Sequence, residues 1–184
     1  MSVIKSFPDR YASKVATILM LDEEINKMLY YNDKNDVDIY TLPKVKNPIT
    51  QLKDKKVFLN RRVAETFKES DVSMFINVKN DEPYSRYGKK SLFFDTLTLE
   101  VGVICHNACR NTLNGARELI IAERLQEIFR LDERLVEVGK PKIYPTTQSY
   151  NIPYEYNSYI LTVKVNYFID RPWNIQNNEL VVKI

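Results

Sequence analysis

The chain has 184 residues, of which 44% are hydrophobic and 28% are charged, and its formal net charge is +3. One domain commonly has this length, and the hydrophobic share suffices to fill a core, which excludes global disorder. The near balance of 27 basic and 24 acidic residues excludes the concentrated positive field of a dedicated nucleic-acid-binding protein. No linker-like stretch divides the chain, so we predict one domain over residues 1–184.

The start of the chain lacks the apolar block of a signal peptide, because Lys5, Asp9 and Arg10 interrupt it. Nothing later reaches the roughly 18 apolar residues that a membrane span needs. We therefore expect a protein that folds in the cytosol without a membrane partner.

Apolar residues at helical spacing predict one long amphipathic helix from Asp9 to Tyr30. Residues 36–62 then contain Pro43, Pro48 and short β-branched pieces, which predict an extended loop with one short strand at most. This loop also carries seven basic side chains, namely Lys44, Lys46, Lys53, Lys55, Lys56, Arg61 and Arg62. We expect it to act as a contact arm.

Alternation of apolar and polar residues predicts the strands of one sheet. The clearest strand runs from Asp95 to Cys105, and its predicted inward residues are Leu97, Leu99, Val101, Val103 and Cys105. Further strands are predicted at Val72–Val78, Leu135–Val138 and Tyr159–Ile169, with residues 81–90 as a hairpin-like loop and residues 141–156 as a connection.

A second helix is predicted from Gly115 to about Arg130, with Asn114 as its cap. Its predicted sheet-facing residues are Ile121, Leu125, Ile128 and Phe129, and its predicted solvent-facing residues are Arg117, Glu123, Arg124 and Glu127.

The tail after Pro172 is too apolar to stay in water without a partner. We predict that residues 171–184 form an extended arm that docks on the chain itself or on a neighbour. Together these elements predict an α+β fold, with a single antiparallel or mixed sheet of about four to five strands packed against two helices.

The segment from Cys105 to Cys109 holds the one histidine, His106, and places three soft ligands within five residues. A structural zinc site needs four ligands, and no further Cys or His exists. Because a continuous strand or helix would hold the two cysteines apart, we expect no disulfide. His106 would diverge from Cys105 across a strand, which argues against a Cys/His catalytic pair.

The 4 glycines provide neither a phosphate-binding loop nor a dinucleotide fingerprint. We therefore expect no cofactor, no metal, no small-molecule substrate and no enzymatic activity. An enzyme built from scattered carboxylates and tyrosines is the last-ranked alternative.

The order of elements carries a resemblance: a long helix ending at Leu29–Asp33, a β-hairpin, the strand Asp95–Cys105, the helix Gly115–Arg130 and a closing strand. Over roughly residues 10–170 this order resembles the tail terminator and related neck or tail-completion proteins of tailed bacteriophages. The resemblance implies a homo-oligomeric ring, typically a hexamer, in the tail or neck of a virion assembled in the host cytoplasm. Such a ring caps the tail tube protein, ends its polymerisation and joins it to the head-side connector protein.

In that ring, the loop 36–62 and the arm 171–184 are the segments expected to contact neighbours. The candidate interface residues are Lys44, Lys46, Lys53, Lys55, Lys56, Arg61, Arg62, Trp173, Leu180 and Val182. Passing DNA would make a passive contact at most. A head-completion or connector adaptor and a baseplate component are alternatives of the same class. A more remote alternative is a nucleic-acid-binding accessory protein, whose affinity would fall steeply with salt.

Overall fold

The computed structural model of the chain describes residues 6–59, 71–86, 89–146, 154–168, 173–176 and 179–182. A five-stranded mixed sheet of order β1-β2-β3-β7-β6 forms its centre, with β1 parallel to β2 and the other neighbours antiparallel. Its strands are β1 (Val57–Phe58), β2 (Val72–Arg86), β3 (Lys89–His106), β7 (Tyr156–Phe168) and β6 (Lys142–Thr146). The predicted α+β fold with a single mixed sheet is confirmed.

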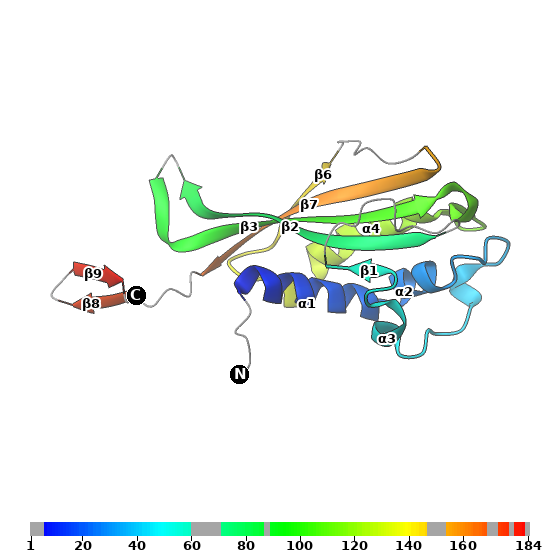
Figure 1. Ribbon diagram of the computed structural model, residues 1–184, viewed down its shortest axis with the longest axis horizontal. Helices are drawn as coiled ribbons and strands as arrows, with labels where there is room; N and C mark the ends of the chain where they lie inside the picture. The colour runs from blue at the N-terminus through cyan, green and yellow to red at the C-terminus, as the bar shows by residue number, and fades with distance from the viewer. Residues whose placement is uncertain are drawn as a thin grey trace.

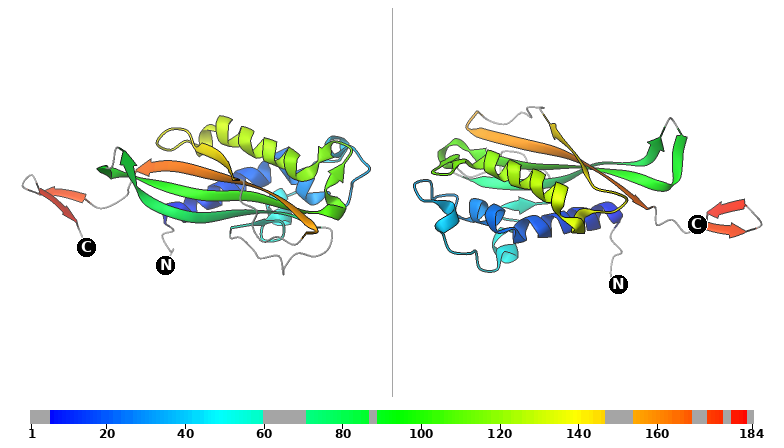
Figure 2. Two further views of the ribbon diagram at one scale, coloured as in Figure 1. Left: turned by 90° about the horizontal axis from the view of Figure 1, so that it is seen from above. Right: turned by 180° about the vertical axis from the view of Figure 1, so that it is seen from behind.

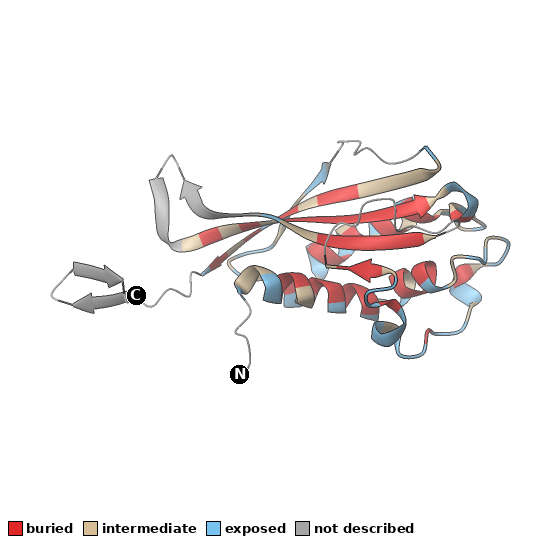
Figure 3. Cartoon of the chain, viewed as in Figure 1, coloured by how far each residue is buried: buried red, intermediate tan, exposed pale blue. Residues whose placement is uncertain are grey.

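Helices α1 (Phe7–Leu21) and α4 (Arg117–Leu131) lie on the same face of this sheet, as Figure 2 shows from two sides. One hydrophobic cluster joins them to the inward residues of the strands, including Leu97, Leu99, Val101, Val103, Leu161 and Val163. Figure 3 shows the buried residues along the helices where they face the sheet. The predicted inward residues of β3 and the predicted sheet-facing residues of α4 are therefore confirmed.

The predicted single N-terminal helix is wrong, because the chain leaves the helical conformation at Asp22 (φ −67°, ψ 125°). The Asp22 carboxylate accepts a hydrogen bond from the backbone N–H of Ile25 (3.1 Å) and caps a second helix, α2 (Glu23–Tyr30). Capping satisfies a donor that would otherwise lack a partner at the helix start. Apolar spacing continues on both sides of this one residue, so periodicity does not reveal the break.

The segment predicted as an extended loop contains a 3-10 turn, η1 (Ile39–Thr41), helix α3 (Pro48–Leu52) and β1. Ile39, Leu52 and Val57 are buried, and α3 packs against α1 and α2 (Figure 1). The one short strand is confirmed, whereas the extended loop is wrong. Short apolar pieces between prolines are buried here through contacts that spacing does not predict.

The hairpin of β2 and β3 is longer than predicted. Residues 81–90, predicted as a loop, continue the pairing down to Arg86 opposite Lys89. Register shifts between Val78 and Asn80 and between Pro83 and Ser85 interrupt the alternation. Such irregularities accommodate proline within a strand. They also break the alternation of apolar and polar residues, which is why the sequence predicted a loop here. In Figures 1 and 2 this hairpin extends beyond the first turn of α1.

Two predictions after α4 and one before it are also wrong. The strand predicted at Leu135–Val138 is absent from the described residues: Leu135 ends a 3-10 turn, η4 (Glu133–Leu135), and Glu137 forms only an isolated bridge with Gly139. Strand β6 lies in the segment predicted as a connection. Pro145 argues against a strand in the sequence, but proline is tolerated in β6 because β6 lies at the edge of the sheet.

Asn114 does not cap α4, since Ala116 occupies the cap position after a small hairpin of β4 (Asn111–Thr112) and β5 (Gly115–Ala116). The Asn114 side chain instead accepts from the backbone N–H of Ile39 (3.1 Å).

The face of the sheet opposite the helices carries a smaller apolar cluster of Phe75, Ile104 and Ile160. The Phe75 ring lies over Gly102, where a Cβ would come within 2.5 Å of the ring and 3.1 Å of Ile160. Glycine is therefore required at this position by close packing.

Replacing Gly102 with alanine is expected to lower the free energy of unfolding by about 1–3 kcal/mol, because the Phe75 ring must shift. Urea denaturation followed by circular dichroism measures this loss. In a Phe75→Leu background the same alanine should cost clearly less. An equal cost in both backgrounds would contradict the proposed clash.

The C-terminal segment forms a two-stranded hairpin of β8 (Trp173–Gln176) and β9 (Glu179–Val182) within the described residues. In Figures 1 and 2 it lies beyond the end of β7, away from the helices. The predicted extended arm is thus a hairpin.

Candidate functional site

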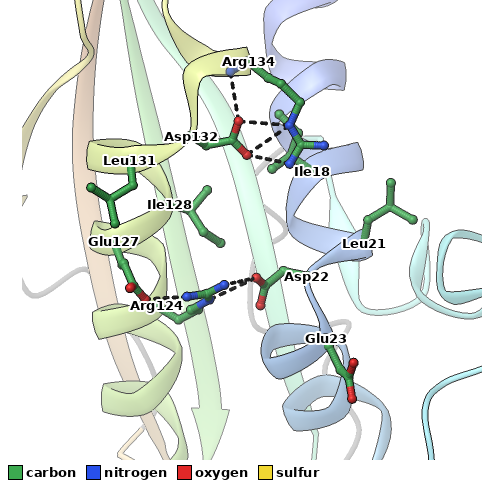
Figure 4. A pocket seen from close by; sticks show the side chains of 10 residues that line it. All are labelled: Ile18, Leu21, Asp22, Glu23, Arg124, Glu127, Ile128, Leu131, Asp132 and Arg134. Atoms are coloured by element: carbon green, nitrogen blue, oxygen red, sulfur yellow. Dashed lines mark hydrogen bonds and ion pairs between the residues drawn. The ribbon is translucent and has the colours of Figure 1, made fainter.

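A groove lies between α4 and the junction of α1 and α2 (Figure 4). It holds about 440 Å³, with Ile18 and Ile128 among its apolar lining. At its rim Leu21 and Leu131 keep 49% and 67% of their surface exposed. These two leucines are large apolar groups that the described part of the chain leaves in water.

Ion pairs cross and flank this groove. Arg124 of α4 donates from Nε and Nη2 to the Asp22 carboxylate at 3.0 and 2.8 Å, and it also pairs with Glu127. These bonds raise the pKa of Arg124, led by the hydrogen bond to Asp22. Beside them, the hydrogen bonds from Arg134 lower the pKa of Asp132. Arg124 and Arg134 in the groove are therefore each paired with a neighbouring carboxylate.

A carboxyl group acts as a general acid or base when its pKa lies near the operating pH. The Asp132 pKa is shifted in the opposite direction, and Asp22 is engaged by Arg124. Apolar side chains within a rim of paired charges are instead the composition of a protein contact surface.

A second hollow of about 490 Å³ lies between the start of α1 and the end of β7. Phe7 stacks on Tyr167 with ring centroids 3.8 Å apart, and Phe168 beside them is 68% exposed. The Tyr11 hydroxyl in this hollow donates to the carbonyl oxygen of Leu135 (2.7 Å), and burial raises its pKa. Both effects keep the Tyr11 phenol protonated near neutral pH.

Arg117, predicted to face solvent, is completely buried (0% exposed). Its Nε donates to the carbonyl oxygen of Cys109 (2.8 Å), Nη1 to that of Met28 (2.8 Å) and Nη2 to the Asn35 side chain (3.3 Å). Met28 lies in the last turn of α2, where helix carbonyls are free and carry partial negative charge. The guanidinium thus binds three chain segments together.

The sequence contained a signal for this buried arginine. Arg117 precedes Ile121, Leu125 and Ile128 by 4, 8 and 11 positions, which places it on the apolar stripe of α4. The neighbouring Glu118 is also buried and accepts from Arg110 Nε at 2.6 Å. Charged residues at inward positions of a helix therefore identify a polar cluster within the core.

The two cysteines lie closer than predicted. β3 ends at His106, and the 3-10 turn η3 (Asn107–Cys109) folds the chain back, so the Sγ atoms of Cys105 and Cys109 are 3.9 Å apart. The prediction that chain geometry separates them is wrong, because it assumed one continuous element. Both cysteines are free thiols.

His106 Nδ1 accepts a hydrogen bond from the backbone N–H of Ala108 (3.1 Å), and the ring packs edge-on against Tyr156. Within the described ranges, no three or more His, Cys, Asp or Glu side chains are grouped to hold a metal ion.

The structure describes five of the seven predicted basic residues. Lys44, Lys46, Lys53 and Lys55 are exposed, and Lys44 pairs with Glu23 (2.8 Å). Lys56 is half-buried and pairs with Asp71. Arg61 and Arg62 lie outside the described residues.

Of the predicted interface residues in the arm, Trp173 pairs with Val182, and Leu180 pairs with Ile175. Residues that pair across a hairpin share a face, so these four apolar residues belong to one face of β8–β9. Asn174, Gln176, Glu179 and Val181 belong to the other face by the same register. One face of the hairpin is therefore wholly apolar and the other mostly polar, which tail composition alone did not show.

No helix in the described ranges has both the length and the apolar character needed to cross a bilayer. The model of the YomW family, a phage-derived family named for a gene of the Bacillus phage SPbeta region, matches residues 22–165. No curated protein matches the chain.

Proposed function

The chain belongs to the phage-derived YomW family, and from this premise we propose that it is a structural protein of the phage particle, acting as a tail terminator. In this role copies of the chain form a ring at the head-tail junction. The ring caps the tail tube, ends its polymerisation and joins it to the head-side connector.

The observation that carries the proposal is that two β-hairpins extend from the same end of the domain, as Figures 1 and 2 show for β2–β3 and β8–β9. A two-stranded hairpin alone in water is marginally stable at best. Extended hairpins gain stability when they add to a neighbouring sheet or cover a neighbouring apolar surface. Repeated around an axis, such head-to-tail contacts close into a ring.

The groove between α4 and the α1–α2 junction supports the same assignment. Its exposed Leu21 and Leu131 lie beside paired charges, a composition that suits subunit contact better than reaction chemistry. Within the ring, we assign the hairpin β8–β9 to contact with the next copy through the face that contains Ile175 and Leu180.

Light scattering of the purified chain, followed by negative-stain imaging, tests this function. We expect a species of about six subunits that images as a closed ring. A chain that stays monomeric at every protein and salt concentration, and also in the presence of tail tubes, would contradict the proposal.

A matched pair of variants tests the role of the hairpin. Ile175→Lys introduces a charge on the apolar face and is expected to shift the ring to smaller species. Asn174→Lys adds the same charge to the adjacent residue on the polar face and should leave the ring intact. Circular dichroism checks that both variants keep the fold. Rings of equal stability in both would show that the hairpin is not the contact.

Binding partners separate this role from its alternatives. A terminator should bind tail tubes, whereas a connector adaptor or baseplate component would bind other virion proteins. Retention on DNA at low salt that falls steeply as salt rises would instead favour a nucleic-acid-binding role for the exposed lysines near α3.

A further inference from the structure

The strongest chemical feature outside the proposed assembly surfaces is the pair of thiols at the end of β3. Cys105 and Cys109 are buried to 0% and 1% exposure, and their Sγ atoms are 3.9 Å apart. A disulfide requires the sulfur atoms to approach to about 2.05 Å. Rotation of the two side chains would have to close the remaining distance.

Hydrogen bonds fix the position of Cys109 beside Cys105. Its Sγ donates to the carbonyl oxygens of Asp71 (3.4 Å) and His106 (3.3 Å), and its own carbonyl oxygen accepts from the buried Arg117. The hydrogen bond from Cys105 lowers the pKa of Cys109 against the effect of burial, and the Arg117 charge also lowers it. Hydrogen bonding to Cys109 and burial raise the pKa of Cys105. A thiol with a lowered pKa beside one with a raised pKa is the arrangement of an attacking and a resolving cysteine.

The turn that holds Cys109 gives small oxidants a route to it. Asn107 and Ala108, which precede it in η3, are exposed at the surface. A local opening of this single turn would uncover the thiol without unfolding the sheet.

We propose that Cys105 and Cys109 are a reversible modification site, in which a peroxide oxidises the two thiols of the folded protein to an intramolecular disulfide. This inference does not depend on the proposed assembly role. The bond would tie η3 to the end of β3 and fix the Cys109 carbonyl that Arg117 binds.

The reaction proceeds in two balanced steps. The Cys109 thiolate attacks one oxygen of the peroxide, forms a sulfenic acid and releases hydroxide from hydrogen peroxide. Cys105 then loses its proton and attacks the Cys109 sulfur, and the sulfenic oxygen leaves as water. In total, two thiols lose two electrons and two protons, and one hydrogen peroxide becomes two water molecules.

The sequence makes the test direct. No Lys or Arg lies between Lys90 and Arg110, so trypsin releases both cysteines in one peptide, residues 91–110, which contains no methionine. The folded, reduced chain is treated with hydrogen peroxide, alkylated under denaturing conditions and digested. We expect this peptide to lose about 2 Da and to take up no alkylating agent, and dithiothreitol should restore two alkylated cysteines.

Two controls make the result specific. Cys105→Ala should leave Cys109 as a sulfenic acid or a more oxidised form, with no 2 Da loss, and a non-reducing gel should show the oxidised wild type as a monomeric chain. Wild-type chain that is unfolded in urea serves as the positive control for the oxidant. If the unfolded chain forms the disulfide and the folded chain keeps two free thiols, the proposal is overturned. Oxidation of the folded chain to sulfinic acid without the 2 Da loss would overturn it as well.

Discussion

Replacing Arg117 with leucine is expected to lower the free energy of unfolding by about 3–5 kcal/mol. The substitution removes the hydrogen bonds that the guanidinium donates and leaves the buried carbonyl oxygens of Cys109 and Met28 without this donor. Each buried acceptor left unsatisfied costs roughly 1–3 kcal/mol. Urea denaturation monitored by circular dichroism measures the total loss in the free energy of unfolding.

The same substitution at Arg130 is the matched control, because Arg130 is exposed on the same helix and bonds the Gln126 side chain at 3.3 Å. We expect Arg130→Leu to change stability by less than about 0.5 kcal/mol. Arg117→Lys should give an intermediate loss, since an ammonium group keeps the charge but not the planar arrangement of donors. Equal losses at positions 117 and 130 would show that the buried network contributes little.

Replacing Leu99 with aspartate is expected to unfold the domain. Leu99 is fully buried between β2 and β7, opposite Val163 in the register. An unpaired charge in such a position costs at least about 3–5 kcal/mol, a large share of the stability of a single domain. Val163→Asp should have the same effect, and far-UV circular dichroism with soluble yield measures both.

The neighbouring Thr98 provides the contrast, because it points to the other face of β3 and is half-exposed. Thr98→Asp should leave a folded, soluble protein. Lys164, which lies opposite residue 98 in the register, can form an ion pair with the new carboxylate. A folded Leu99→Asp variant would show that the assigned strand faces are inverted.

Strand faces were predictable from the sequence because alternation depends on the backbone alone. Leu97, Leu99 and Val101 alternate with polar residues, and the structure buries all three. The break at Asp22 could not be predicted in this way, because a single capping residue leaves the apolar spacing on either side unchanged. Boundaries in general depend on local hydrogen bonds, which periodicity does not report.

Contacts between distant segments were the least predictable. The groove depends on the contact between Asp22 and Arg124, which lie 102 positions apart in the sequence. Nothing in the sequence around either residue indicates that the two pair. The short distance between the two thiols was not predicted because the turn after His106 reverses the chain within three residues. Arg117 differs from these cases, because its place on the apolar stripe of α4 was visible in the spacing.

The bonds of Arg117 also bear on the order in which the chain folds. Its oxygen acceptors lie 8, 82 and 89 positions away along the sequence, so two of these three contacts close long loops. Because such contacts cost more loop-closure entropy than local hairpins and helices, we expect them to form late. With that order of folding, the buried guanidinium is expected to slow unfolding more than it speeds folding.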